Sequence, residues 1–179
     1  SVAIFASRER TDDVLETIHA AIKAAAEPTI IDVLVNGNDA LASALVDCLK
    51  LTPPNSNRAQ VGVWKLQLAD KANAWNQYLY EIWQFTETAF FLDGHCRPNE
   101  GGFKALADGL AANPYALAGS AVPSVGRTAA QWRTQLLTQG GMVGGFLAIR
   151  NSTMEILRER GFRLPVGLYG FDGVLGAIF

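Results

Sequence analysis

The 179-residue sequence is poor in cysteine, methionine and histidine, with two of each, and only 18% of its residues are charged. Two cysteines, Cys48 and Cys96, are too few for a disulfide framework, so we expect reduced thiols in a protein that faces the cytosol. The formal net charge of −2 provides no basic surface for nucleic acid or for an anionic membrane. We therefore expect no nucleic-acid partner.

Long apolar runs are also missing, because none reaches the roughly 18 residues that a membrane-spanning helix needs. These residues are thus expected to hold no membrane segment. The length and the 49% hydrophobic content fit one globular domain with a substantial core. The sequence has no initiator methionine and ends inside the apolar stretch 174–179. We expect residues 1–179 to be a single domain of a longer native chain.

Short apolar segments of strand length alternate along the chain with segments of helical periodicity. The strand-like segments are 2–6, 30–35, 61–68, 88–92 and 146–150. Helical patterns lie between them, and in the one that follows Asp70 the aromatic face with Trp75 and Trp83 is interpreted as core. Ser152 and Glu155 fit a capping box at the start of a later helix. The alternation predicts an α/β fold, with helices on both faces of a mainly parallel sheet.

The segment that most directly suggests chemistry is the apolar run 88–92, which ends in Asp93-Gly94-His95. In open α/β sheets the ligand crevice lies beyond the carboxyl ends of the strands. Asp93 and His95 are two residues apart, so in an extended chain both side chains point the same way. A carboxylate oxygen and an imidazole nitrogen there would suit one divalent ion. The alternative is that Asp93 caps the next segment and His95 is a solvated loop residue.

Polar side chains also follow the other predicted strands or begin the helices after them. They are Arg8, Arg10, Asn36, Asp39, Lys71 and Asn76. Because the carboxyl ends of parallel strands meet at one edge of a sheet, these groups are expected to converge there. Such a convergence is what a nucleotide-binding site needs.

Five segments, in this order, resemble motifs of the family 2 glycosyltransferases, which have the GT-A fold. They are Val35–Asp39, Lys71–Asn76, Phe91–Pro98, Gly144–Arg150 and Gly170–Asp172. In that family the matching motifs are the turn after the second strand, a Gly-Lys-Ala-x-Ala-Leu-Asn helix start, the metal-binding Asp-x-Asp segment, the segment before the acceptor-side helix, and a Glu-Asp pair. The resemblance covers nearly the whole chain and implies a GT-A, Rossmann-like fold.

The resemblance also implies a reaction. An inverting glycosyltransferase of this kind moves a sugar from a nucleoside-diphosphate sugar to an acceptor hydroxyl, here on a glycan or a lipid-linked acceptor, with help from Mn²⁺ or Mg²⁺. The implied roles are base and ribose binding for Ala6, Arg8 and Asn36, phosphate binding for Lys71 and Asp93, metal binding for Asp93 and His95, and general base for Asp172. The implied location is the cytoplasm, including the inner face of the membrane.

Three departures from the family pattern matter for this interpretation. His95 stands in place of the second Asp, Asn36 in place of an Asp, and Phe171 in place of the Glu before the general base. An imidazole ligand favours Mn²⁺ over Mg²⁺, which prefers oxygen. These changes keep open a non-catalytic nucleotide-sugar-binding module on the same fold. A sugar-phosphate nucleotidyltransferase is a further alternative, although the segment 7–10 lacks the glycine-rich loop of those enzymes.

Overall fold

The computed structural model describes residues 1–51, 59–168 and 170–178, except for the side chains of Phe171 and Asp172. Its strands are β1 (Val2–Ala6), β2 (Thr29–Asn36), β3 (Ala59–Leu66), β4 (Thr88–Asp93), β5 (Ala118–Ser120) and β6 (Phe146–Arg150). Its helices are α1 (Thr11–Ala24), α2 (Asp39–Leu51), α3 (Lys71–Gln77), η1 (Tyr78–Ile82), α4 (Gly102–Ala112), α5 (Ala129–Gln139), α6 (Asn151–Glu159) and α7 (Phe171–Ile178). Among these described residues, no helix is both long and apolar enough to cross a membrane.

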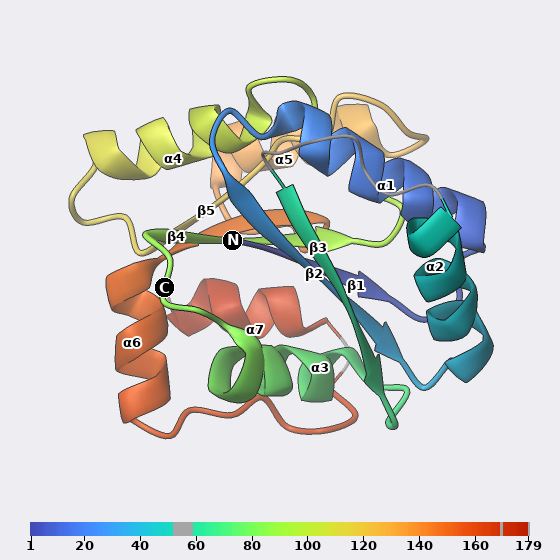
Figure 1. Ribbon diagram of the computed structural model, residues 1–179. Coiled ribbons are helices and arrows are strands. Elements are labelled where there is room, and N and C mark those ends of the chain that lie inside the picture. The colour runs from blue at the N-terminus through green and yellow to red at the C-terminus, as the bar shows by residue number, and fades with distance from the viewer. Residues whose placement is uncertain (52–58, 169, 179) are drawn as a thin grey trace.

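The strands form one sheet in the order β3-β2-β1-β4-β6-β5. The pairs β1–β2, β1–β4 and β2–β3 are parallel, whereas β6 runs antiparallel to both β4 and β5. Helices α1, α2 and α4 cover one face, and α3, α6 and α7 cover the other (Figure 1). The predicted α/β fold, a mainly parallel sheet with helices on both faces, is confirmed.

Alternation along the strands sends side chains into two separate cores, one on each face of the sheet. In β1, for example, Ile4 packs under α1 and α2, while Phe5 packs under α3. Trp75 of α3 is fully buried, and its ring stacks on Phe91 of β4 at a centroid distance of 6.2 Å. Trp83 is also buried, so the interpretation of these aromatics as core is correct. The predicted long helix changes at Tyr78 into the π-helix η1.

The expected capping box at Ser152 is wrong. The N-cap position of helix α6 is Arg150, two residues before Ser152, and it has no side-chain capping bond. The Arg150 guanidinium instead donates to the backbone carbonyls of Ala116, at 2.6 Å, and Asn113, at 2.8 Å. These tertiary bonds fix the end of β6, so the helix starts directly after the strand.

The start of α3 is fixed by the side chain of Asp70. Its Oδ1 accepts a hydrogen bond from the backbone N–H of Asn73 at 2.6 Å, which is an N-cap interaction. Its Oδ2 accepts a second bond from the backbone N–H of Gly167 at 2.8 Å. Farther along, the buried Asn76 side chain exchanges two hydrogen bonds with the backbone of Leu164. The segment that leads to α7 is therefore held along α3.

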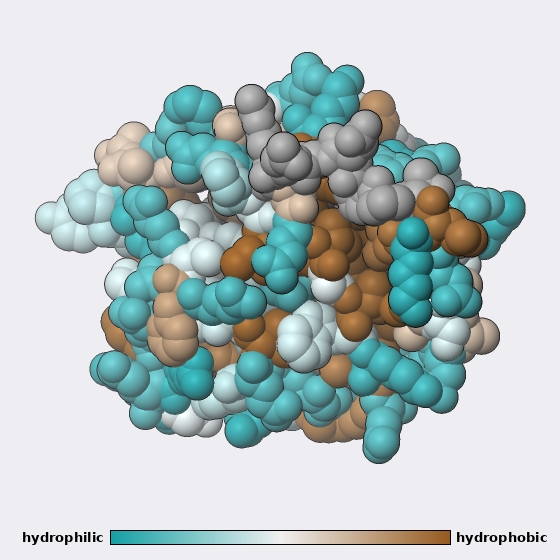
Figure 2. Space-filling model, in the orientation of Figure 1, coloured by the Kyte–Doolittle hydropathy of each residue, from teal (hydrophilic) through white to brown (hydrophobic). Residues whose placement is uncertain are grey.

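Among the strands that the structure describes, β3 is an edge strand of the sheet. In Figure 2 apolar residues gather over the middle of the face on which Figure 1 places β3, and the Trp64 side chain of this strand is 41% exposed. Lys65 sits within the strand and forms an ion pair with Asp39 at 2.8 Å. A charged side chain on an edge strand opposes pairing with another chain.

Asp32 in β2 is a buried carboxylate away from the carboxyl edge of the sheet. It is 3% exposed, and its Oδ1 accepts a hydrogen bond from Trp64 Nε1 at 2.8 Å. Its Oδ2 has no hydrogen-bond partner among the residues described. Burial raises the pKa of Asp32 above its ordinary value, and the Trp64 bond offsets this only in part. The native protein therefore binds this proton more tightly than the unfolded chain does.

This raised pKa predicts a pH dependence of stability. The contribution of Asp32 should be most favourable below its unfolded pKa of about 3.9 and should decline as the pH rises through the higher native value. We expect Asp32→Asn, which keeps an acceptor for Trp64, to raise the urea midpoint at about pH 7 and to leave it unchanged at about pH 3. A lower midpoint for the variant at neutral pH would contradict the assignment.

Candidate functional site

A cavity of about 260 Å³ lies at the carboxyl ends of β1, β2 and β4. Its lining residues are Phe5, Ala6, Ser7, Arg8, Glu9, Asn36, Ala69, Asp70, Lys71, Asp93 and His95. Six of the residues predicted from the sequence are among them, namely Ala6, Arg8, Asn36, Lys71, Asp93 and His95. The sheet brings them together because β1 lies between β2 and β4, so three strand ends meet at one edge.

Lys71 and Asp93 form an ion pair inside this cavity. Lys71 is the first residue of α3, and Asp93 is the last residue of β4. The Lys71 ammonium also lies 5.6 Å from the ring centroid of Phe5. The two charged side chains are 31% and 25% exposed, so salt screens this pair less than a surface pair. Asp93 is thus neutralised by a cation of the protein itself.

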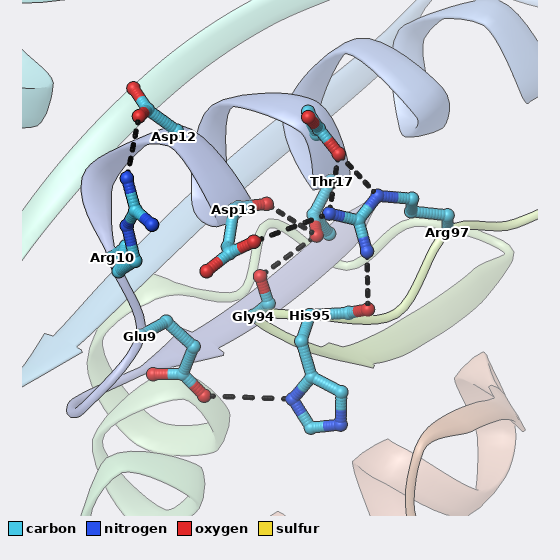
Figure 3. Close-up of polar contacts among 9 residues, drawn as sticks. Glu9, Arg10, Asp12, Asp13, Thr17, Gly94, His95 and Arg97 are labelled. Carbon is cyan, nitrogen blue, oxygen red and sulfur yellow. Dashed lines mark hydrogen bonds and ion pairs between the residues drawn. The ribbon is translucent and has the colours of Figure 1, made fainter. Parts of the chain in front are cut away.

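Glu9 faces His95 across the cavity (Figure 3). Its Oε2 accepts hydrogen bonds from the backbone N–H groups of Ser7, at 2.7 Å, and Arg8, at 3.0 Å. Its Oε1 lies 3.7 Å from Nδ1 of His95. Burial by itself raises the pKa of Glu9, but the backbone hydrogen bonds and the nearby imidazole together lower this pKa below its usual value. Glu9 is therefore a fixed negative charge beside His95.

Gly94 allows the end of β4 to pack closely against β1. Its N–H donates to the Phe5 carbonyl at 2.7 Å, and its own carbonyl accepts from Thr17 Oγ1 at 2.8 Å (Figure 3). A Cβ at this position would lie 3.0 Å from the Phe5 carbonyl oxygen and 3.2 Å from Cδ of Glu9. The absence of a side chain here is what lets Asp93 and His95 share a cavity with Glu9.

Asn36 is a buried polar residue at the end of β2. It is 3% exposed, and its side-chain Oδ1 is buried with no hydrogen-bond partner in the described part of the chain. Its backbone carbonyl accepts from Ser7 Oγ at 2.9 Å. A buried acceptor without a donor costs about 1–3 kcal/mol. Asn36 also lines the cavity, at the end of the strand that lies beside β1.

No protein-family model matches the chain, and no curated protein sequence matches it. The mannosyltransferase PcManGT from Pyrobaculum calidifontis, in complex with GDP-Man and Mn²⁺, superposes with a TM-score of 0.71 at 16% identity, over 98% of this chain and 50% of that one. S. aureus TarS, residues 1–349, superposes with a TM-score of 0.63 at 11% identity, over 99% and 54% of the two chains.

The chain has the GT-A fold. A second TarS structure, in complex with UDP-GlcNAc, superposes with a TM-score of 0.60 at 10% identity, over 99% of this chain and 52% of that one. The GT-A chain described here therefore spans about half the length of these structures.

Other residues predicted at strand ends lie elsewhere in this GT-A chain. Arg10 pairs with Asp12 at 3.5 Å on the surface, Asp39 pairs with Lys65, and Asn76 is buried against Leu164. Asp172 belongs to the first turn of α7, but its side chain is outside the part of the chain that the structure describes. Its role as general base stays a prediction.

Glu9 is the cavity residue that the sequence reasoning missed. The sequence shows it only as one member of a polar cluster after the first strand. The signal that points to Glu9 is its position three residues after β1. It therefore lies at the same edge of the sheet as His95, which comes two residues after β4. That argument needs the two strands to be neighbours, as they are in this sheet.

Cys96 supplies no nucleophile at this edge of the GT-A chain. Burial, and secondarily the charge of Asp93, raise the pKa of its thiol to about 11. A thiol with this pKa stays protonated at neutral pH, whereas nucleophilic cysteines act as thiolates. Both cysteines are free, as expected from the sequence.

A divalent metal fits the donor atoms here only if other ligands complete its shell. Across the described residues, no group of three His, Cys, Asp or Glu side chains is arranged to hold a metal ion. Asp93 and His95 nevertheless place one oxygen donor and one nitrogen donor on the same cavity. Mn²⁺ accepts both donor types. The pair therefore suits an ion that takes its remaining ligands from a phosphate-bearing compound and water.

Proposed function

We propose that this chain is the donor-binding domain of an inverting, metal-assisted glycosyltransferase. It would move a sugar from a nucleoside-diphosphate sugar to a hydroxyl of a glycan or a lipid-linked acceptor, in the cytoplasm or at the inner face of the membrane. The observation that carries this proposal is the single cavity that gathers Asn36, Lys71, Asp93 and His95 at the carboxyl edge of a GT-A sheet.

The residues predicted from the sequence have roles that follow from their chemistry. Asn36 and Ala6 would lie against the base and ribose, since both line the cavity. Arg8 and Lys71 would balance the negative charge of the diphosphate. Asp93 and His95 would hold Mn²⁺ or Mg²⁺, which when bound supplies Lewis-acid stabilisation of the departing diphosphate. Asp172 would accept the proton of the acceptor hydroxyl, a contribution of about 10²–10⁴ in rate.

The ligands of the structurally similar proteins support this choice of substrate. PcManGT was solved with GDP-Man and Mn²⁺, and TarS with UDP-GlcNAc. Both ligands are nucleoside-diphosphate sugars. For this chain the base, the sugar and the metal are all proposals, and a family 2 type of mechanism is part of the same proposal.

Calorimetric titration with UDP-sugars and GDP-sugars tests the proposal. We expect at least one of these two series to bind in the presence of Mn²⁺. Its affinity should fall about 5–150-fold when EDTA removes the metal, because coupling between two ligands is typically worth about 1–3 kcal/mol. UMP and GMP are matched controls, since they carry the bases without the diphosphate. If no nucleotide sugar binds with Mn²⁺ present, the proposed function fails.

A second candidate function is a binding module that holds a nucleotide sugar without turning it over. The observation in its favour is that Asp93 is already paired with Lys71, while the His95 side chain is 68% exposed beside Glu9. Release of nucleoside diphosphate from the bound donor, followed over hours, separates the two. A binding module would retain the intact donor.

A further inference from the structure

The Asp93 carboxylate forms an ion pair with the ammonium of Lys71, and the fold holds Lys71 in place. Lys71 begins α3 directly after Asp70, whose side chain bonds the backbone N–H groups of Asn73 and Gly167. The residue directly before Lys71 is therefore anchored at two points. Its ammonium reaches Asp93 past the ring of Phe5. The start of α3 is thus held by the N-cap bond from Asn73 and by the tertiary bond from Gly167, both to the residue next to Lys71.

The charges around the cavity explain why this pairing matters. Among the described residues that line it, the ionisable side chains besides His95 are two cations, Arg8 and Lys71, and three anions, Glu9, Asp70 and Asp93. Asp70 and Glu9 already accept backbone hydrogen bonds. A divalent ion that approaches Asp93 thus meets an ammonium on the same carboxylate, and like charges at such distances repel strongly in a partly buried site.

We propose that Lys71 is an exchangeable counter-ion for the metal site. In the unloaded cavity its ammonium neutralises Asp93; when a divalent ion binds Asp93, the ammonium leaves that carboxylate and pairs with the diphosphate of the donor. The inference rests on the proposed function for the identity of the diphosphate. Metal and donor binding are then positively coupled. A bound metal frees the Lys71 ammonium to pair with the diphosphate, and a bound diphosphate draws that ammonium away from the carboxylate that the metal needs. By thermodynamic linkage the coupling is the same in both directions.

The first arm of the test uses Mn²⁺ alone, without nucleotide, and follows the loss of the free Mn²⁺ resonance by electron paramagnetic resonance. Lys71→Met removes the charge and keeps most of the stem. We expect it to bind Mn²⁺ about tenfold more tightly than the wild type, because the competing cation is gone. Lys65→Met is the matched control, since it removes a lysine from a surface pair with Asp39. It should bind Mn²⁺ as the wild type does.

The second arm repeats the Mn²⁺ titration with UDP or GDP at one fixed concentration in every sample. For the wild type we expect the nucleotide to tighten Mn²⁺ binding by about 5–150-fold, the usual range of such couplings. In Lys71→Met the factor should be smaller than in the wild type, because only direct coordination of Mn²⁺ by the diphosphate remains to couple the two ligands. Because binding of Mn²⁺ to free nucleotide is the same in each sample, it cancels in the comparison of variants.

Several outcomes decide the matter. Equal or weaker Mn²⁺ binding by Lys71→Met, in the absence of nucleotide, overturns the proposal. If that variant does not fold, judged by circular dichroism, Lys71→Gln takes its place in both arms. A chain that binds no nucleotide sugar, but whose Lys71→Met variant gains affinity for Mn²⁺, would uphold the counter-ion and reject the proposed function. If the chain binds a nucleotide sugar, but the wild type and Lys71→Met have equal affinities for Mn²⁺, the proposed function stands and the counter-ion role of Lys71 is rejected.

Discussion

An Asp93→Asn variant is expected to lose about 10²–10³-fold in metal-dependent cleavage of the nucleotide sugar, since Lewis-acid stabilisation is worth several kcal/mol and about 1.4 kcal/mol corresponds to a factor of ten. The amide keeps the shape of the carboxylate but is a poor ligand for a divalent ion. It also releases Lys71 from its ion pair. Release of nucleoside diphosphate, measured with and without Mn²⁺, reports the effect.

Asp39→Asn is the matched control for this experiment. Asp39 also follows a strand at the carboxyl edge of the sheet, but it is exposed and pairs with Lys65 outside the cavity. Its replacement should leave the rate within a factor of about two, because exposed ion pairs contribute little. Cleavage by Asp93→Asn at the wild-type rate in Mn²⁺ would show that Asp93 has no part in the chemistry.

The largest expected effect on stability comes from Gly37→Ala, in the turn between β2 and α2. Gly37 has a φ of +63°, and its N–H donates to the Leu66 carbonyl at 2.8 Å. An added Cβ would lie 2.6 Å from Cβ of Ala69 and 2.7 Å from its backbone nitrogen. Backbone strain and steric overlap therefore act together. We expect the free energy of unfolding to fall by about 3–5 kcal/mol, measured by urea denaturation.

Gly101→Ala separates the two contributions. Gly101 also has a positive φ, of +75°, but no atom lies within 4 Å of the position of its missing Cβ. This variant should cost only the conformational part, about 1–2 kcal/mol. Equal losses for Gly37→Ala and Gly101→Ala would mean that contact with Ala69 adds nothing, and our account of the turn would be wrong.

The sequence predicts the cavity residues one at a time but not their pairing. Asp93 is identifiable because an apolar run ends there, and Lys71 because a helical pattern begins there. Their ion pair depends on α3 lying over β1 and β4, and on β1 separating β2 from β4. Hydrophobic periodicity shows which side of a strand is buried. It contains no information about which helix covers that side.

Local signals fail where distant parts of the chain determine the conformation. Ser152 and Glu155 have the spacing of a capping box, yet the bonds from Arg150 to the 113–116 segment set the helix start. Glu9 gains its place from backbone N–H groups that turn toward it within the loop, a geometry that residue types do not specify. Asp172 remains the prediction that most needs a direct test, by mutation and rate measurement.

The two hydrogen bonds of Asp70 have a mechanical consequence. One carboxylate connects the first turn of α3 with Gly167, 97 positions later in the chain. The neighbouring residue, Lys71, supplies the ammonium on Asp93. A single carboxylate thus joins the 165–168 segment to the start of α3, so replacing Asp70 would remove both of these anchors together.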